Sequence, residues 1–281
     1  MTTIEARYDA SASAYRQWWE PVLAASAREL LDRLEQAGGP PAGRLLDVGT
    51  GAGLLAIEAV RRWPELRVTG LDGSAEMLAV AEAAAQASLD PTHQARLTWL
   101  RGHAGRLPFD DGSFDLVVSS FVYQLVPNLT AALAEAHRVI RPDGRFGLVT
   151  WQVAEEPFAP DEAFEAALDD LELDFDDEEP EEARSGDLAS ARATATRLRR
   201  LGFRDVQARE AWLEYQHDPA TYGAFLEGYA ERELFAGLEP GDRDRLRALT
   251  SARLARLEPA AFRWRVPVIY ALARRPALGG P

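Results

Sequence analysis

The amino-acid sequence predicts an α/β fold in which helices flank a mostly parallel β-sheet. Three observations favour this class. Short apolar runs that resemble strands alternate with helix-like segments between residues 44 and 151, as is typical of parallel sheets. The first of these runs enters a helix through a turn that contains three glycines. The chain has 281 residues, of which 47% are hydrophobic, and this is enough for one large packed domain.

Residues 1–40 are expected to form a helical N-terminal cap. Their apolar side chains recur at near-helical spacing, and the Gly38–Pro41 run then ends the helix. The side chains with this spacing are Trp18, Val22, Leu23, Leu30, Leu31 and Leu34.

The core of the sheet is expected within residues 41–152. A turn at 141–144 should precede the last strand of this region, and Ser74 should cap the second helix. The expected strands are 45–48, 68–71, 97–100, 114–119 and 145–151, and the expected helices end near Trp63, run from Ser74 through Ala87, and cover 130–140.

Residues 153–187 are predicted to be an acidic helical insertion. From Glu155 to Glu182 there are acidic side chains but no basic ones, while apolar side chains recur with helical spacing. An amphipathic helix with a solvated acidic face explains this pattern. The apolar positions are Phe164, Leu168, Leu171 and Phe175.

The rest of the chain should complete the core and add a lid. Residues 188–216 and 263–275 are expected to supply a helix at 189–201 and strands at 204–215 and 263–273. Residues 217–262 should form a helical lid, marked by Tyr222, Phe225, Leu226 and Tyr229. Pro267 falls inside the last strand, where proline removes a ladder donor, so we expect a bulge or an unpaired position there. The whole chain, 1–281, is thus expected to be a single domain.

Composition excludes several classes of protein. Cysteine is absent, which removes disulfides, thiolate nucleophiles and cysteine metal sites; lysine is absent too, which removes Schiff-base chemistry. No calcium-loop spacing occurs, and no metal is expected. The net charge of −14 disfavours a nucleic-acid partner. Without a membrane-length apolar run or a signal-like start at 1–10, a cytoplasmic location is expected.

The strongest motif is the segment 45–53, Leu-Leu-Asp-Val-Gly-Thr-Gly-Ala-Gly. Glycines at such a strand-to-helix turn let the backbone approach a ligand that meets the helix N-terminus. A dinucleotide fingerprint would need its third glycine at position 54, where Leu54 stands, so the NAD interpretation is weakened. Asp72 ends the next expected strand, where a carboxylate can accept hydrogen bonds from both ribose hydroxyls of an adenosine.

These residues and four further motifs resemble the class I S-adenosylmethionine (SAM)-dependent methyltransferases, in particular the small-molecule enzymes of the ubiquinone/menaquinone-biosynthesis kind. The resemblance implies a seven-stranded Rossmann-like sheet with an antiparallel last strand, and it implies SAM as cofactor with S-adenosylhomocysteine as product. The further motifs are LPFDDGSFD at 107–115, VVSS at 117–120, RVIRPDG at 138–144 and LGFRDV at 201–206.

The resemblance also implies positions for the cofactor. Gly49 and Gly51 would lie under the methionine part, Asp72 on the ribose, Met77 against the adenine, and Ser119 near the amino group. The full set of expected cofactor residues is Tyr15, Asp47, Gly49, Thr50, Gly51, Asp72, Gly73, Met77, Gly102, His103, Ala104 and Ser119.

Two positions depart from the family pattern. His103 stands where an acidic residue commonly accepts a bond from the adenine amino group; a neutral ring nitrogen of His103 can accept it instead. Gln124 stands where a histidine is common, and Gln124 cannot act as a general base. No catalytic residue is assigned.

The aromatic opening Tyr8, Tyr15, Trp18 and Trp19 resembles a segment that folds over the cofactor in related enzymes. Tyr8 and Tyr15 are seven residues apart and should share one helical face. Substrate contacts are expected from Tyr8, Trp19, Tyr123 and Gln124. Structural or surface roles are expected for His93, His137, His217, Glu210 and Glu214.

The predicted function is the transfer of a methyl group from SAM to an O, N or C atom of a small molecule, mainly by alignment and exclusion of water. Two alternatives remain: a SAM-binding protein that catalyses a step other than methyl transfer or uses SAM structurally, and an NAD-type oxidoreductase. The partner is a small-molecule acceptor, no nucleic acid or membrane span is expected, and a homodimer is an open alternative. Helices at 158–175 and 219–235 are expected to roof the pocket together with the N-terminal helix.

Overall fold

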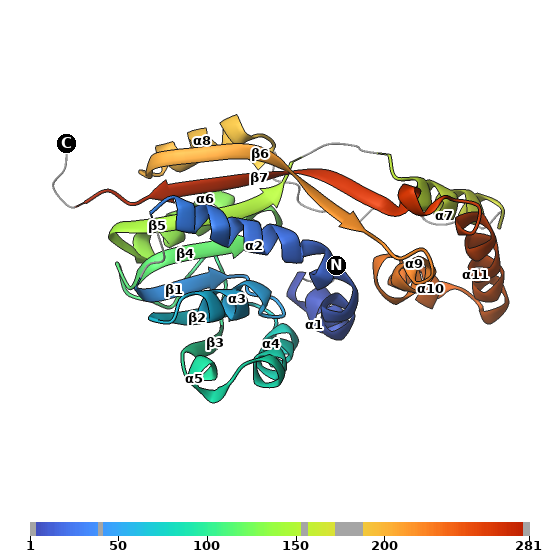
Figure 1. The fold of residues 1–281 in the computed structure, drawn as a ribbon, viewed down its shortest axis with the longest axis horizontal. Coiled ribbons are helices and arrows are strands. Elements are labelled where there is room, and N and C mark those ends of the chain that lie inside the picture. Colours follow the sequence, from blue (N-terminus) through green and yellow to red (C-terminus); the bar gives the residue numbers. More distant parts are fainter. Residues whose placement is uncertain (1–3, 39–41, 153–156, 172–187, 278–281) are drawn as a thin grey trace. The chain divides into compact units, whose positions relative to one another are not determined.

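Seven strands form one sheet in the order β3-β2-β1-β4-β5-β7-β6 (Figure 1). The computed structural model describes residues 4–38, 42–152, 157–171 and 188–277. β1 to β5 pair in parallel, and β7 pairs with β5 in the antiparallel direction, so the predicted sheet is confirmed. The strands are β1 Gly43–Val48, β2 Leu66–Asp72, β3 Leu97–Arg101, β4 Phe114–Ser120, β5 Ile140–Trp151, β6 Arg204–Gln216 and β7 Arg263–Arg274.

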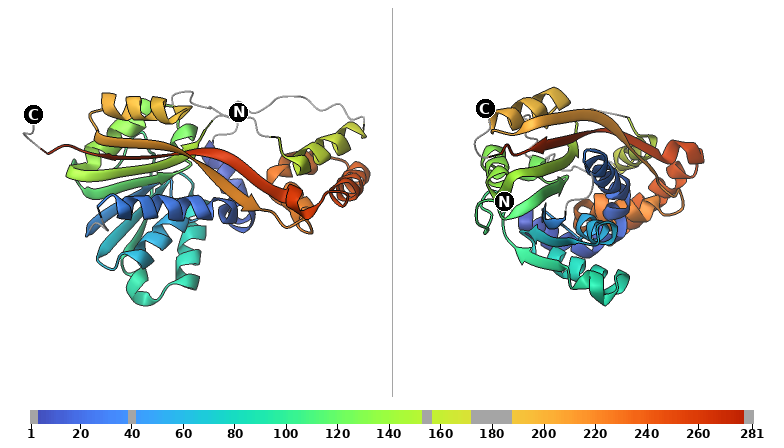
Figure 2. Two further views of the ribbon diagram at one scale, coloured as in Figure 1. Left: turned by 45° about the horizontal axis from the view of Figure 1, so that its top comes forward. Right: turned by 60° about the vertical axis from the view of Figure 1, so that its left-hand side comes forward.

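Helices cover both faces of this sheet (Figures 1 and 2). On one face α2 packs against α3 and β5; on the other, α6 and α8 cover a core that includes Phe146 and Phe203. The helices of this part are α1 Ile4–Ala14, α2 Glu20–Gln36, α3 Leu54–Arg62, α4 Ala75–Ser88, α5 Pro91–Gln94, α6 Leu129–Val139 and α8 Ala191–Arg200. The short α5 was not expected. Ser74 caps α4 as predicted, because its side chain accepts a bond from the Met77 N–H at 3.0 Å.

The N-terminal cap is helical, but it is not one regular helix. A π-helical turn, Tyr15–Trp19, separates α1 from α2. π-helical turns often occur at functional sites. The buried face of α2 contains Leu23, Leu30 and Leu34, as the spacing predicted, whereas residues 39–41 of the expected helix breaker lie outside the described residues.

The expected turn at 141–144 is part of β5 rather than a separate connection. Phe114 pairs with Ile140 and Leu116 pairs with Arg145, so the register shifts between them and the intervening residues of β5 bulge out. Asp143 has a φ of 64°, a left-handed conformation that such an irregularity requires. Pro267 lies one position beyond the β5–β7 ladder, and its carbonyl accepts a bond from the Gln152 N–H at 3.0 Å.

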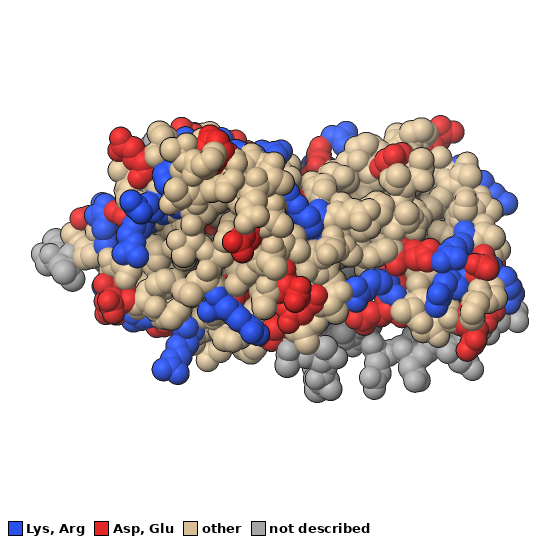
Figure 3. Space-filling model, turned by 90° about the horizontal axis from the view of Figure 1, so that it is seen from below, with Lys and Arg blue, Asp and Glu red and all other residues tan. Residues whose placement is uncertain are grey.

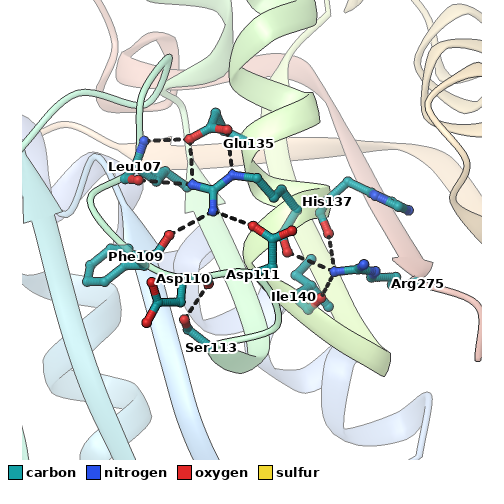
Figure 4. Close-up of polar contacts among 10 residues, drawn as sticks. Leu107, Phe109, Asp110, Asp111, Ser113, Glu135, His137, Ile140 and Arg275 are labelled. Atoms are coloured by element: carbon teal, nitrogen blue, oxygen red, sulfur yellow. Dashed lines mark hydrogen bonds and ion pairs between the residues drawn. The ribbon is translucent and has the colours of Figure 1, made fainter. Parts of the chain in front are cut away.

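Two of the sequence motifs are bound to each other through Arg138 (Figure 4). Its guanidinium donates to the carbonyl groups of Leu107 and Phe109 and to the carboxylates of Asp111 and Glu135, at 2.7–3.0 Å. These bonds lower the pKa of Glu135. The 107–115 and 138–144 motifs therefore fix the loop before β4 to α6, which makes them structural supports.

The described residues form two compact units. The first contains 4–38, 42–152, 188–211 and 267–277, and with them most of the sheet; the second contains 157–171 and 212–266. These ranges overlap the segments expected as insertion and lid, and the single-domain organisation stays a prediction. The helices of the second unit are α7 Ala159–Asp169, α9 Tyr222–Phe225, α10 Arg232–Gly237 and α11 Pro240–Leu254.

The second unit differs from the expected helices in two ways. The predicted 158–175 helix is described only as α7, and Phe175 lies outside the described residues. The predicted helix at 219–235 is interrupted, because a π-helical turn at Leu226–Ala230 follows α9 and a new helix, α10, begins after Glu231. Phe164 and Tyr222 are buried in this unit as their spacing indicated.

Candidate cofactor site

The glycine loop lies between β1 and α3, at the carboxyl end of the sheet. Gly49, Gly51 and Gly53 have φ angles of 70°, 53° and 86°, a region that favours glycine. Among the described residues, a Cβ on Gly51 would find only the ring of Tyr15 within 4 Å, at 3.8–3.9 Å. A ligand could therefore approach the backbone at Gly51, between the loop and the N-terminal segment.

Asp72 ends β2 beside this loop. Its Oδ2 accepts the Gly51 N–H at 2.8 Å and its Oδ1 accepts the Ser74 N–H at 2.9 Å. Burial raises the pKa of Asp72, and the backbone hydrogen bonds oppose that rise. Each carboxylate oxygen has further lone pairs, so Asp72 can also accept hydrogen bonds from a ligand.

Asp47 and Thr50 lie beneath the loop, away from its surface. Asp47 is 1% exposed, and its Oδ2 accepts a bond from the Thr50 hydroxyl at 2.7 Å. Burial raises the pKa of Asp47 to about 7. Ser119, on β4, is also 1% exposed and donates to the Val48 carbonyl at 2.8 Å. In this structure these three side chains therefore support the loop from below.

The N-terminal helix packs onto the same region. The rings of Tyr8 and Tyr15 meet edge to face at 6.1 Å, as their spacing predicted, and both pack against the buried cluster of Ala12, Ala52 and Met77. Asp9 accepts bonds from the Ser74 hydroxyl and from the Glu76 N–H, at the start of α4. These bonds lower the pKa of Asp9.

The expected adenine edge lies beside β3. His103 is exposed, and its Nδ1 lies 3.5 Å from the Glu5 carboxylate of α1. A Cβ on Gly73 would meet Glu5 at 3.0 Å and His103 at 3.4 Å, so these three residues are neighbours. Gly102 lies against Leu71, and Ala104 packs against the core.

A second group lies at the carboxyl ends of β4 and β5. The Trp151 ring packs against Phe121 at 4.1 Å and against Trp19 at 6.3 Å. Phe121 has a φ of 56°, which is unusual for an aromatic residue and marks local strain. The Gln124 side chain bridges the two strand ends: it donates to the Phe121 carbonyl at 2.6 Å and accepts from the Thr150 hydroxyl at 2.9 Å.

Tyr123 does not join either group. It is 1% exposed, and its ring packs against Phe146 in the core. The Tyr123 ring belongs to the core cluster that includes Leu129 and Leu133 of α6, whereas the neighbouring Gln124 reaches the strand ends. A contact between Tyr123 and substrate has no support in this arrangement.

The residues expected to have structural or surface roles lie in ion pairs, at the surface or against aromatic rings. His93 and the Asp90 carboxylate are bonded at 2.7 Å, Glu214 pairs with Arg263, and Glu210 is exposed. His137 packs on Phe203. His217 is buried among aromatic rings of the second unit, and this burial lowers its pKa to about 4.

Sequence reasoning missed four residues in these groups: Glu5, Asp9, Phe121 and Trp151. Glu5 and Asp9 lie four residues apart on α1, a spacing that could have placed both on the face toward β2. Trp151 ends a predicted strand, which is also a visible signal. Phe121 carries no comparable pattern.

The described residues contain no helix long and apolar enough to cross a membrane. Within the same ranges no cluster of histidine and acidic side chains is arranged to hold a metal ion.

Comparison with known proteins agrees with this geometry. Residues 46–148 match a family model described as a methyltransferase domain. The chain is 42% identical over 115 residues to the ubiquinone/menaquinone biosynthesis C-methyltransferase UbiE of Dinoroseobacter shibae, covering 41% of this chain and 44% of that protein. It is 39% identical over 106 residues to the demethylmenaquinone methyltransferase of Deinococcus radiodurans, and this match covers 38% of this chain and 42% of that protein.

A solved structure shows the same fold at low identity. This structure is phosphoethanolamine N-methyltransferase 2 of Haemonchus contortus, crystallised with phosphomonomethylethanolamine and S-adenosylhomocysteine. Its superposition on this chain has a TM-score of 0.56 at 20% identity, and it covers 95% of this chain and 57% of that one. The chain spans less than half the length of the two curated relatives named above. The resemblance found in the sequence is confirmed over part of the chain: residues 46–148 match the methyltransferase-domain model, and 41% of the chain is similar to a UbiE-type C-methyltransferase.

Proposed function

We propose that this protein transfers the methyl group of SAM to a small-molecule acceptor. The observation that carries the proposal is the pairing of the loop Gly49–Gly53 with Asp72: an open glycine turn and a carboxylate lie within one hydrogen bond of each other, at the carboxyl end of the sheet. Ligands of open α/β sheets bind at that end. The named activities of the relatives support the same reaction.

The residues present fit SAM as the cofactor. The turn at Gly51 leaves backbone accessible beside the Tyr15 ring, and an aromatic face can attract the positive charge of a sulfonium. Asp72 has acceptor capacity for ribose hydroxyls. Tyr8 and Tyr15, which are partly buried and pack against the cluster that contains Met77, offer an apolar surface for a purine. When bound, SAM supplies an electrophilic methyl group.

The roles of the protein's own residues follow from their placement. Asp72 would fix the ribose, the 49–53 loop would hold the methionine part, and Tyr15 would cover it. Ser119 and Asp47 would act through the loop, because both are buried beneath it. Orientation and exclusion of water are the main contributions, since positioning two reactants can account for roughly 7–11 kcal/mol of a barrier.

The acceptor is proposed to lie near Trp19, Trp151 and Phe121. This aromatic group offers flat apolar surface at the strand ends next to the loop. A ring compound of the quinol or phenol class fits this surface, in line with the names of the UbiE-type relatives. The net charge of −14 supports a small molecule rather than a nucleic acid, and blue and red side chains are interspersed on the face shown in Figure 3. The cytoplasmic location and the homodimer stay predictions.

Calorimetry tests the cofactor, and mass spectrometry tests the reaction. SAM and S-adenosylhomocysteine should bind, whereas NAD should not; the opposite preference would refute the proposal. Methyl-labelled SAM is then incubated with phenols, quinols, amines and acids. A labelled acceptor is the expected result, whereas binding of SAM without labelled product in any class would favour the non-methyl-transfer alternative.

A further inference from the structure

Glu20, the first residue of α2, is a buried carboxylate that the proposed function does not yet use. The residue is 7% exposed. Its Oε1 pairs with Arg16 one helical turn earlier, while its buried Oε2 has no hydrogen-bond partner among the described residues. A buried polar atom without a partner is costly, so such an atom in a native protein calls for an explanation.

The direction of α2 places Glu20 at the ligand-binding end of the sheet. Leu34, near the end of α2, lies against Gly147 in the middle of β5, whereas Trp19 at its start meets Trp151 at the end of β5. Between them, Tyr270 of β7, the register partner of Val149, donates to the Ser26 carbonyl. The helix therefore runs antiparallel to β5, and its first turn reaches the carboxyl edge of the strands.

The side chain of Glu20 faces the protein rather than solvent. Glu20 lies on the same helical face as Leu23, Ala27 and Leu31, which are all buried. Trp19, the preceding residue, contributes to the aromatic group proposed to hold the acceptor. Glu20 therefore follows a residue of the proposed acceptor surface in the sequence and lies at the same end of the strands.

We propose that Glu20 is the proton acceptor of the methyl transfer. This inference rests on the proposed function. In the reaction Glu20 Oε2 takes the proton from the acceptor atom, that atom uses the freed electron pair to bond the methyl carbon, and the electron pair of the broken sulfur–methyl bond stays on sulfur. Arg16 holds the other oxygen of the carboxylate, so Oε2 is the oxygen available for the proton.

The electrostatics of Glu20 suit this role. Burial raises the pKa of Glu20 to about 7, and the Arg16 guanidinium opposes that rise. General bases work best when their pKa is near the working pH. The other charged side chains of α2 form ion pairs farther from Glu20: Arg28 with Glu58, Glu29 with Arg33, and Asp32 and Glu35 with Arg62.

Three variants test the proposal. Glu20→Gln keeps an oxygen that can accept from Arg16 but removes the proton acceptor. Glu20→Asp retains a carboxylate on a shorter side chain. Glu29→Gln is the matched control, because Glu29 lies on the same helix and also pairs with an arginine four residues away, Arg33, at 2.8 Å, but its side chain is 46% exposed. Thermal unfolding checks that each variant folds.

The first readout is catalytic, with labelled SAM and 1,4-dihydroxynaphthalene as the probe. We expect Glu20→Gln to lower kcat by about 10²–10⁴-fold, with the Kd of SAM within about two-fold of the native value. The native kcat should rise with pH through about 7, and Glu20→Gln should lose this rise. Glu20→Asp should keep part of it, and Glu29→Gln should match the native protein.

The second readout does not depend on turnover. In carboxyl-¹³C-glutamate NMR with S-adenosylhomocysteine bound, the resonance that Glu20→Gln removes should titrate near 7. A Glu20 resonance that shows no titration near 7, or a Glu20→Gln variant with native kcat, overturns the inference. Failure of the native protein to label any acceptor would instead count against the proposed function.

Discussion

Removal of the Asp72 carboxylate should weaken SAM binding and also loosen the glycine loop. The carboxylate accepts the N–H groups of Gly51 and Ser74 at 2.8 and 2.9 Å. Hydrogen bonds to charged groups are worth about 1.5–3 kcal/mol, so the loss of its bonds to ribose in Asp72→Ala should raise the Kd of S-adenosylhomocysteine by about 10–150-fold. The two backbone donors lose their partner as well, which should destabilise the fold by about 1–3 kcal/mol and lower Tm by about 2–12 °C.

Isothermal calorimetry and differential scanning calorimetry measure the two effects separately. Asp90→Ala is the matched control, because Asp90 also accepts backbone and side-chain bonds at a helix start, but at α5. It should leave the Kd unchanged. Asp72→Asn should not rescue binding, since its amide NH₂ would face one of the two backbone donors. A native Kd in Asp72→Ala would refute the assignment of the site.

Three further variants follow from the same geometry. Gly51→Val should abolish SAM binding in calorimetry, because its side chain occupies the space beside Tyr15. The main effect of Gly53→Val should be a lower Tm, since a Cβ there meets Ala81 at 2.9 Å. Loss of binding in Gly53→Val with a lower Tm as the main effect of Gly51→Val would contradict the loop assignment. His103→Asp should bind SAM more tightly only when combined with Glu5→Gln, because the new carboxylate would otherwise face Glu5; additive effects in a double-mutant cycle would refute this. Asp47→Asn should reduce the fall of Tm between about pH 4 and 7, because the folded protein keeps a proton on Asp47 up to about 7 while the unfolded chain releases it near 3.8. This contribution to stability is therefore lost as pH rises through 7. An unchanged Tm profile would show that Asp47 does not titrate there.

The fold could be predicted well because its signals are local. Apolar runs separated by glycine-containing turns locate β1 to β5, and the Ser74 cap locates α4 to within a residue. The π-helical turn at Tyr15–Trp19 could not be predicted in this way, because its residues continue the helical pattern and only packing decides the extra residue in the turn. The bulge after Ile140 likewise depends on pairing with β4, which the sequence of β5 alone does not specify.

The candidate site was predictable where the chain itself brings residues together. The loop and Asp72 lie at the ends of adjacent strands, so topology alone makes them neighbours. Tyr123 shows the limit of such reasoning: it follows β4 closely, yet a turn of three residues sends its ring into the core and Gln124 to the strand ends. The residue types favour this outcome, because a tyrosine ring buries apolar surface and a glutamine amide needs hydrogen-bond partners, but substrate contacts were expected from both.

Glu20 shows how the same limit can hide a reactive group. In the sequence it reads as an acidic residue in the first turn of an amphipathic helix, where carboxylates are common because they interact favourably with the helix dipole. Its helical position places it in line with Leu23 and Ala27, so the same periodicity that predicts a buried face also predicts a buried charge. Burial of a carboxylate costs free energy, and Arg16 engages only one of its oxygens. A polar residue on the apolar face of a predicted helix is therefore the kind of inconsistency that points to function, and the Glu20 variants decide whether it does so here.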